Sequence, residues 1–154
     1  MESFRHLVAP IVLATCLIGG TEIALAAEGV AGPVIADVIR VVDGDTILVS
    51  ARPWPQQTVE VLVRLRGIDA PELKAKCSEI RRAARTAKDR LDQLVGEGRS
   101  VLLTNVSGDK YFGRVVADVR LADGTNPAQD LVAAGLATAY HGGRKLPPHC
   151  QRPV

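Results

Sequence analysis

Residues 63–72 read VRLRGIDAPE, a segment that carries the end of a predicted strand into a charged loop. The strand is expected over Thr58 to Arg66, because apolar and polar residues alternate there. One face holds Val59, Val61, Val63 and Leu65, and the other holds Glu60, Leu62, Arg64 and Arg66. We expect the first face to lie in the core and the second to meet solvent or carry chemistry.

Before this strand, Val34 to Ser50 is rich in β-branched residues and is interrupted only by Asp43, Gly44 and Asp45. This pattern predicts two strands joined by a tight turn. The prolines in the segment RPWPQQ, residues 52–57, then predict a loop rather than the interior of a strand.

After the GIDAPE loop, a helical periodicity predicts a helix over Ser78 to Val95, ended by Gly96. Its apolar stripe comprises Ile80, Ala83, Ala84, Ala87, Leu91, Leu94 and Val95, and its outer face comprises Arg81, Arg82, Arg85, Lys88 and Arg90. The basic face has two interpretations, a phosphate-binding ridge or an ordinary solvated surface. The second is the more usual role of such a face.

Strands are expected again over Ser100 to Val106 and Arg114 to Leu121. Asn126 is placed to cap, and Pro127 to open, a short helix that runs through Ala134 and is closed by Gly135. A last extended piece, Leu136 to Tyr140, leads into a Gly- and Pro-rich tail. The fold class is therefore mainly β with helices (α+β), a five-stranded OB-type barrel with its longer helix between the third and fourth strands.

The N-terminus has the features of an export signal over residues 1–26, with cleavage after Ala26 or Ala27. The apolar stretch from Leu7 to Gly20 contains Pro10 and is shorter than the about 20 residues that span a bilayer. We therefore expect a secreted or periplasmic protein without a stable membrane anchor, in which residues 27–154 form a single domain. The net charge of +2 is compatible with a polyanionic partner but too small to argue for one.

Two carboxylates are expected at one rim of the barrel. Asp45 follows the first tight turn and Asp69 follows the third strand, so pairing of these strands would bring them together. Oxygen ligands of this kind suit calcium or magnesium, whereas zinc would favour His or Cys. The alternative for each acid is a local role, because Asp and Gly favour turns in any protein.

Three segments together resemble the signature segments of staphylococcal-nuclease-like thermonucleases. They are VVDGDTILV at 41–49, VRLRGIDAPE at 63–72 and DKYFGR at 109–114, in the family's order. The resemblance extends from about Val34 to Tyr140. It implies an OB-fold enzyme that hydrolyses phosphodiester bonds of DNA, with RNA as a further substrate, with little base specificity, and that works as a monomer with a calcium ion.

The resemblance also implies roles for individual residues. Asp45, Asp69 and the backbone carbonyl of Ala70 would bind calcium, and Glu72 would orient or deprotonate the attacking water. Arg64 and Arg114 would donate to phosphate oxygens. Tyr111 and Tyr140 would contact the nucleotide, although His141 also falls close to the second of these positions.

The chain departs from the family's pattern in two places. Phe112 adds a residue to a segment better known as DKYGR, which would either displace Arg114 or be absorbed as a bulge. At the C-terminus, residues 142–154 replace a long helix of the best-known members.

Two other functions are compatible with this sequence. A binding module of the same fold without hydrolysis would have no need for carboxylates where phosphate binds. A phosphodiesterase for small nucleotides would share the chemistry and differ only in substrate reach.

Cys77 and Cys150 remain as a pair once Cys16 leaves with the signal, and in an exported protein we predict a disulfide between them. The bond would stabilise the fold by roughly 4 kcal/mol and would clamp the tail to the barrel in place of the missing helix. Mass spectrometry of a non-reduced digest of periplasmically expressed protein should recover the two linked peptides. Free thiols at both positions would contradict the pairing.

Overall fold

The structure is a computed structural model that describes residues 29–143. The strands are β1 (Gly29–Val30), β2 (Val34–Asp43), β3 (Thr46–Arg52), β4 (Val59–Leu65), β5 (Ile68–Asp69), β6 (Ser100–Gly108), β7 (Arg114–Leu121) and β8 (Thr138–Ala139). The helices are α1 (Ser78–Val95) and α2 (Pro127–Ala133). The export signal predicted over residues 1–26 lies outside the described residues.

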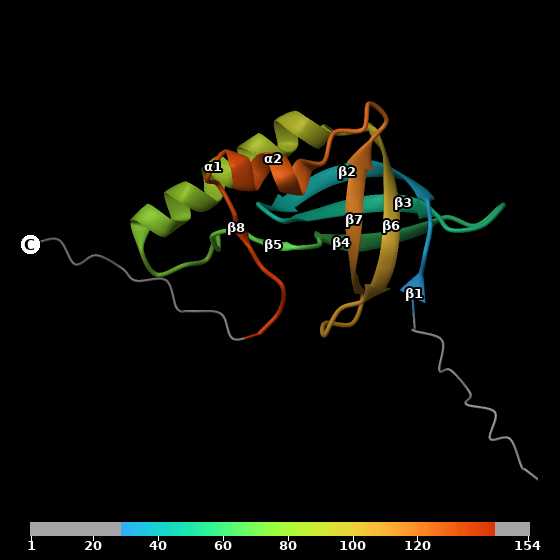
Figure 1. Ribbon diagram of the computed structural model, residues 1–154, viewed down its shortest axis with the longest axis horizontal. Helices are drawn as coiled ribbons and strands as arrows, with labels where there is room; N and C mark the ends of the chain where they lie inside the picture. The colour runs from blue at the N-terminus through green and yellow to red at the C-terminus, as the bar shows by residue number, and fades with distance from the viewer. Residues whose placement is uncertain (1–28, 144–154) are drawn as a thin grey trace, which may run out of the picture.

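Five of the strands close into a barrel. Strand β2 pairs with β3, β3 with β4, β4 with β7, β7 with β6, and β6 with β2. All of these pairings are antiparallel except that of β4 with β7, which is parallel. The short β1 adds to β6 outside the ring. The predicted OB-type barrel is therefore confirmed (Figure 1).

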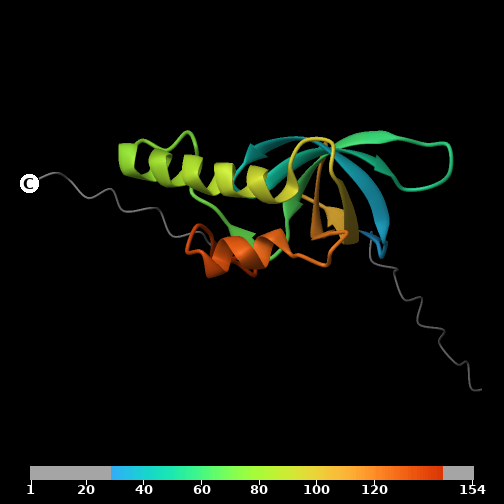
Figure 2. The ribbon, with the colours of Figure 1, turned by 90° about the horizontal axis from the view of Figure 1, so that it is seen from above.

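The core is aliphatic and lies inside the barrel and beneath α1. Ile47, Val63 and Leu65 are at most 1% exposed on the barrel side, and Leu91 is fully buried on the helix side. Both helices lie on the same side of the barrel, with α2 packed beside α1 (Figure 2). In residues 29–143, no helix has the length and apolar character needed to cross a bilayer.

The predicted helices and strands are all present, and their ends differ from the predicted ones by at most two residues. Helix α1 and strand β7 begin and end where the sequence pattern placed them, and the first hairpin appears as β2 and β3. Asn126 caps α2, because its side-chain oxygen accepts hydrogen bonds from the backbone N–H of Ala128 at 3.0 Å and of Gln129 at 3.2 Å. The last extended piece forms β8, which pairs with β5.

The prediction that Val59 belongs to the core is wrong, since 44% of this residue is exposed. Val59 is the first residue of β4 and lies next to the β3–β4 loop, which projects beyond the barrel in Figure 1. The alternation of apolar and polar residues therefore extends past the part of the strand that the core covers. Ala83 of the predicted apolar stripe is also exposed, and on α1 the buried residues are Ala84, Ala87, Leu91 and Val95.

The basic face of α1 is partly structural. Arg90 forms a bidentate hydrogen bond with Asp130 of α2, at 2.8 Å from both Nε and Nη2. Arg81 donates to the backbone carbonyls of Ala75 and Lys76 and so fastens the loop before the helix. Arg82 and Arg85 are exposed, as expected for a solvated face.

Gly44 makes the β2–β3 turn fit against the rest of the molecule. A Cβ atom at this position would lie 2.8 Å from the Cβ of Ala70 and 2.9 Å from the Cβ of Ala87. The turn is thus packed against both the GIDAPE loop and α1, with no room for a methyl group. This packing holds Asp45 in a fixed position relative to Ala70.

We predict that Gly44→Ala destabilises the fold by about 1–3 kcal/mol. The methyl groups of Ala70 and Ala87 have no other rotamer that would make room for the new Cβ, so the backbone must shift. Equilibrium urea denaturation measures the change. Gly108→Ala is the matched control, since a Cβ there meets nothing within 4 Å. Equal stability of the two variants would contradict the packing argument.

Candidate active site

A cleft of about 820 Å³ opens at the rim of the barrel. Its lining comes from the β2–β3 turn, from β4 and the GIDAPE loop, from the loop between β6 and β7, and from the chain after β8. Of the predicted site residues, Asp45, Arg64, Glu72, Tyr111, Arg114 and Tyr140 line it directly. Asp69 joins them through an ion pair with Arg64.

Arg64 bridges the two predicted metal-binding acids. Its Nη1 lies 2.7 Å from Oδ2 of Asp45, and its Nη2 lies 2.7 Å from Oδ1 of Asp69. All three side chains are largely shielded, with exposed fractions of 14% for Arg64, 7% for Asp45 and 23% for Asp69. The expectation that strand pairing brings both acids to one rim is confirmed.

Strand register explains why these groups meet. Thr46 of β3 pairs with Arg64 of β4, and the backbone carbonyl of Asp45 accepts a 2.9 Å hydrogen bond from the N–H of Leu65. Asp45 therefore stands beside Arg64 by backbone pairing. Asp69 reaches the same guanidinium by the turn from β4 to β5, and Nη2 of Arg64 also donates to the carbonyl of Ile68 at 3.2 Å.

The two carboxylates determine the protonation of the bridge. Burial alone would lower the pKa of Arg64, but attraction to Asp45 and the hydrogen bond to Asp69 outweigh burial and raise this pKa above its usual value. The guanidinium is therefore a permanent positive charge between two acids. The trio carries a net charge of −1 when both acids are ionised, which favours a further cation.

The donor set fits a hard cation. Asp45 and Asp69 offer carboxylate oxygens, and the backbone of Ala70 lies against Asp45, whose Oδ2 accepts a 3.2 Å hydrogen bond from the Ala70 N–H. Within residues 29–143, no group of three or more His, Cys, Asp or Glu side chains converges as a metal cluster. A cation here would need carbonyl or water oxygens as well, and calcium and magnesium accept both.

Two further acids share this part of the cleft. Glu72 is exposed and lines the cleft, and its backbone carbonyl accepts a hydrogen bond from Ala75 N–H at 3.1 Å. Asp43 also lines the cleft, and burial together with repulsion from Asp45 and Glu72 raises its pKa. The negative charge that raises this pKa is the same charge that would attract a cation.

Arg114 lies on the other wall and is held in place by its neighbours. Its Nε donates to Oδ2 of Asp109 at 2.5 Å, and its guanidinium carbon lies 4.7 Å from the centre of the Tyr111 ring. Because β4 and β7 pair in parallel, with Leu62 opposite Arg114, both predicted phosphate-binding arginines stand on adjacent strands.

The extra residue Phe112 does not disturb Arg114. The loop of residues 109–113 is closed by hydrogen bonds from Asp109 N–H to the Arg114 carbonyl and from Arg114 N–H to the Tyr111 carbonyl, at 3.1 and 3.2 Å. The turn requires a positive φ at Gly113, 81°, which glycine adopts without steric cost. Phe112 is absorbed at the loop tip with its side chain in solvent, rather than as a bulge in β7.

Tyr140 and His141 both line the cleft, so the structure does not separate these two candidates. Tyr140 continues the β5–β8 pairing, because its N–H donates to the Gly67 carbonyl at 2.8 Å. Its hydroxyl donates to the carbonyl of Gly143 at 2.8 Å.

Cys77 is a buried residue, 8% exposed, and is the N-cap of α1. Cys150 lies outside the described residues, so their pairing stays a prediction.

Sequence reasoning missed several members of the site. It did not foresee the anchoring role of Asp109, nor that Asp43, Arg66 and Lys110 line the cleft. Asp109 and Lys110 belong to the DKYFGR segment. In a short hairpin, an acid five residues before an arginine could have indicated that Asp109 contacts Arg114. Arg66 donates to the carbonyl of Val116 across the β4–β7 junction at 2.9 Å, a contact that requires the barrel to be closed.

Comparison with known proteins gives consistent matches. Residues 62–151 match the family described as Staphylococcal nuclease homologue. Over 103 residues the chain is 38% identical to a protein of Escherichia coli named "Uncharacterized endonuclease" and to its counterpart in Escherichia coli O157:H7. These alignments cover 67% of this chain and 59% of each relative.

We predict that Asp109→Asn removes an acid-sensitive part of the stability. Burial raises the pKa of Asp109, but the hydrogen bonds from Arg114 and from Lys110 N–H outweigh burial and lower it below 3.8. A carboxyl whose pKa is lower in the folded state than in the unfolded state stabilises the fold at pH values above 3.8. This contribution is lost as the pH falls below that value. Urea denaturation should show Asp109→Asn less stable at about pH 7, with the difference shrinking toward about pH 3. A difference independent of pH would contradict this assignment.

Proposed function

Since the chain belongs to the Staphylococcal nuclease homologue family, we propose that it is a metal-dependent endonuclease that hydrolyses phosphodiester bonds of DNA, and of RNA as a second substrate. The relatives named as endonucleases support this proposal, although the chain spans only 59% of their length. The observation that carries it is the Arg64 bridge between Asp45 and Asp69, at a cleft that also holds Glu72 and Arg114.

Phosphodiester hydrolysis places extra negative charge on the phosphate oxygens as water attacks in line. Planar guanidinium groups suit this charge, because each one directs several N–H donors at two oxygens. Arg114 is held through Nε by Asp109 and by the Tyr111 ring, so its Nη groups are the ends that would bind phosphate. Groups held in advance in this way stabilise a transition state without reorganising.

Asp45 and Asp69, with the carbonyl of Ala70, are proposed to hold calcium. The bound ion would supply positive charge close to the reacting phosphate. Arg64 keeps the two acids apart at fixed positions, and the packing of Gly44 against Ala70 fixes the turn that carries Asp45. Oxygen ligands alone suit calcium or magnesium and do not suit zinc.

Glu72 is proposed to take a proton from the attacking water or to orient this water. It is an exposed carboxylate at the cleft, whereas Asp45 is buried and engaged by Arg64, Thr46 and Ala70. General-base help from a positioned carboxylate is worth about 10²–10⁴ in rate. We propose little base specificity, because the roles assigned to these residues concern the phosphate, the metal ion and the attacking water.

We also propose export to the periplasm or the medium and a monomeric state. The support for export is the apolar stretch of residues 7–20 followed by the small residues Ala24, Ala26 and Ala27. Fractionation of cells that express the full chain would test it, and a protein found only with the cytoplasmic fraction would contradict it.

A DNA degradation assay tests the function. Wild-type protein should cleave DNA with calcium and stop when a chelator is added, and Glu72→Gln should lower the rate by about 10²–10⁴. Glu60→Gln is the matched control, because Glu60 is an exposed acid of β4 that does not line the cleft, and it should cleave as the wild type does. Cleavage that survives chelation, or equal rates in wild type and Glu72→Gln, would reject the mechanism. Binding without cleavage by the wild type would favour a binding module.

A further inference from the structure

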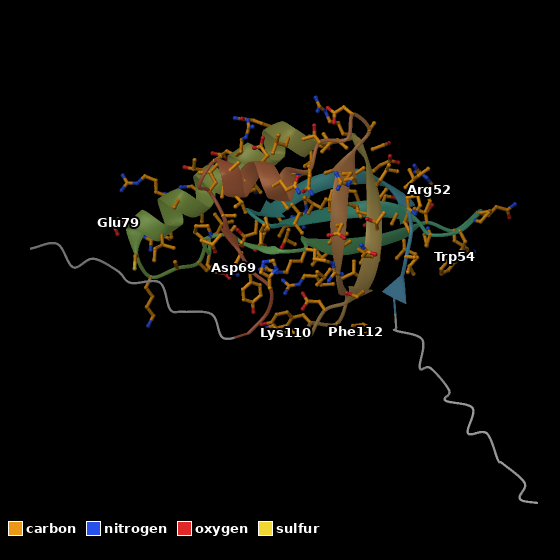
Figure 3. All side chains as sticks on the ribbon, viewed as in Figure 1. Arg52, Trp54, Asp69, Glu79, Lys110 and Phe112 are labelled. Carbon is orange, nitrogen blue, oxygen red and sulfur yellow. The ribbon has the colours of Figure 1, made fainter. Side chains whose placement is uncertain are left out.

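The aromatic side chains of residues 29–143 are distributed unusually. These residues contain Trp54, Tyr111, Phe112 and Tyr140, and none of the four lies in the buried core, which is aliphatic. Tyr111 and Tyr140 line the cleft, and Phe112 follows Tyr111 in the loop of residues 109–113 without being part of the lining itself. Only Trp54 is elsewhere, on the β3–β4 loop at the far end of the molecule (Figure 3).

Phe112 is the most exposed of these side chains. Its relative exposure is 109%, against 56% for Tyr111 and 58% for Trp54. It contributes nothing to the core, although a phenylalanine side chain gains from burial wherever a surface is available. Its side chain therefore presents a ring that is available to a partner outside the described residues.

The loop that carries Phe112 has a defined conformation. Three contacts hold its base: the two backbone hydrogen bonds between residues 109–111 and Arg114, and a 2.6 Å bond from Lys110 N–H to the Asp109 carboxylate. The ring of Phe112 therefore projects from the same loop as Lys110, which lines the cleft (Figure 3).

The same loop also carries positive charge. The Nζ of Lys110 lies 4.9 Å from the centre of the Tyr111 ring, and the guanidinium of Arg114 lies 4.7 Å from it. The ring of Tyr111 is thus engaged by two cations, which leaves Phe112 as the ring at the tip. Cations for phosphate and an open ring for a base are the two elements by which proteins hold single-stranded nucleic acid.

We propose that Phe112 is a stacking residue that binds one unpaired nucleobase of a single-stranded substrate, next to the nucleotide whose phosphate enters the cleft. The inference rests on the proposed function, because it is the phosphodiester in the cleft that brings a base to this loop. Stacking does not distinguish one base from another, since every base has a π-face. It does distinguish single strands from duplexes, in which the faces of the bases already stack on their neighbours.

Binding measurements in the Glu72→Gln background, which slows cleavage, test this role. The probe is a short fluorescent oligothymidine long enough to extend beyond the cleft, measured by anisotropy. Phe112→Ala should weaken its binding by about 5- to 100-fold. The same substitution should change the binding of a duplex, or of an abasic single strand, by less than about twofold, because neither offers a free base face.

Two further variants separate stacking from a structural effect. Phe112→Trp should restore binding of the oligothymidine, because tryptophan offers a larger ring. Trp54→Ala removes an exposed aromatic ring far from the cleft and should leave binding unchanged. Thermal unfolding of Phe112→Ala should match that of the parent, since the side chain packs against nothing in the core.

Equal binding of oligothymidine by Phe112→Ala and its parent would overturn the proposal, and so would an equal loss for oligothymidine, duplex and abasic strand. Vesicles containing phosphatidylserine that sediment with the parent but not with Phe112→Ala, while oligothymidine binding is unchanged, would instead assign the ring to a membrane surface. Failure of the proposed function is a separate result: a wild type that cleaves no nucleic acid, whatever the behaviour of Phe112.

Discussion

The guanidinium of Arg64 is the physical link that organises the cleft. It joins Asp45, in the turn before β3, to Asp69 of β5, with 2.7 Å contacts to both. Without that positive charge, the two carboxylates would only repel each other. With it, Asp45 and Asp69 are held at fixed positions by attraction to one shared guanidinium.

The barrel supplies the rest of the geometry by its closure. Parallel pairing of β4 with β7 sets Arg114 on the strand next to Arg64, and the loop before β7 supplies both the acid that anchors Arg114 and the aromatic rings beside it. The tight contact of Gly44 with Ala70 and Ala87 ties the acid-bearing turn to the helix. Acidic and basic side chains thus line the same cleft.

Local patterns in the sequence predicted what depends on neighbouring residues. The span of α1, the cap at Asn126 and the meeting of Asp45 with Asp69 all follow from periodicity, turn chemistry and strand order. The prediction that Val59 is buried was wrong, because alternation shows which face of a strand a residue occupies and not where the barrel ends. The anchoring of Arg114 by Asp109 and the ion pair of Arg90 with Asp130 depend on long-range packing, which one sequence does not display.

The lining of the cleft runs from Asp43 to Gly142, almost the whole described chain. Strand β8 arrives last and pairs with β5, which brings Tyr140 to a wall begun some 70 residues earlier. Within residues 29–143 β8 is the last strand, so a polypeptide whose synthesis has not reached residues 138–140 lacks one side of the cleft.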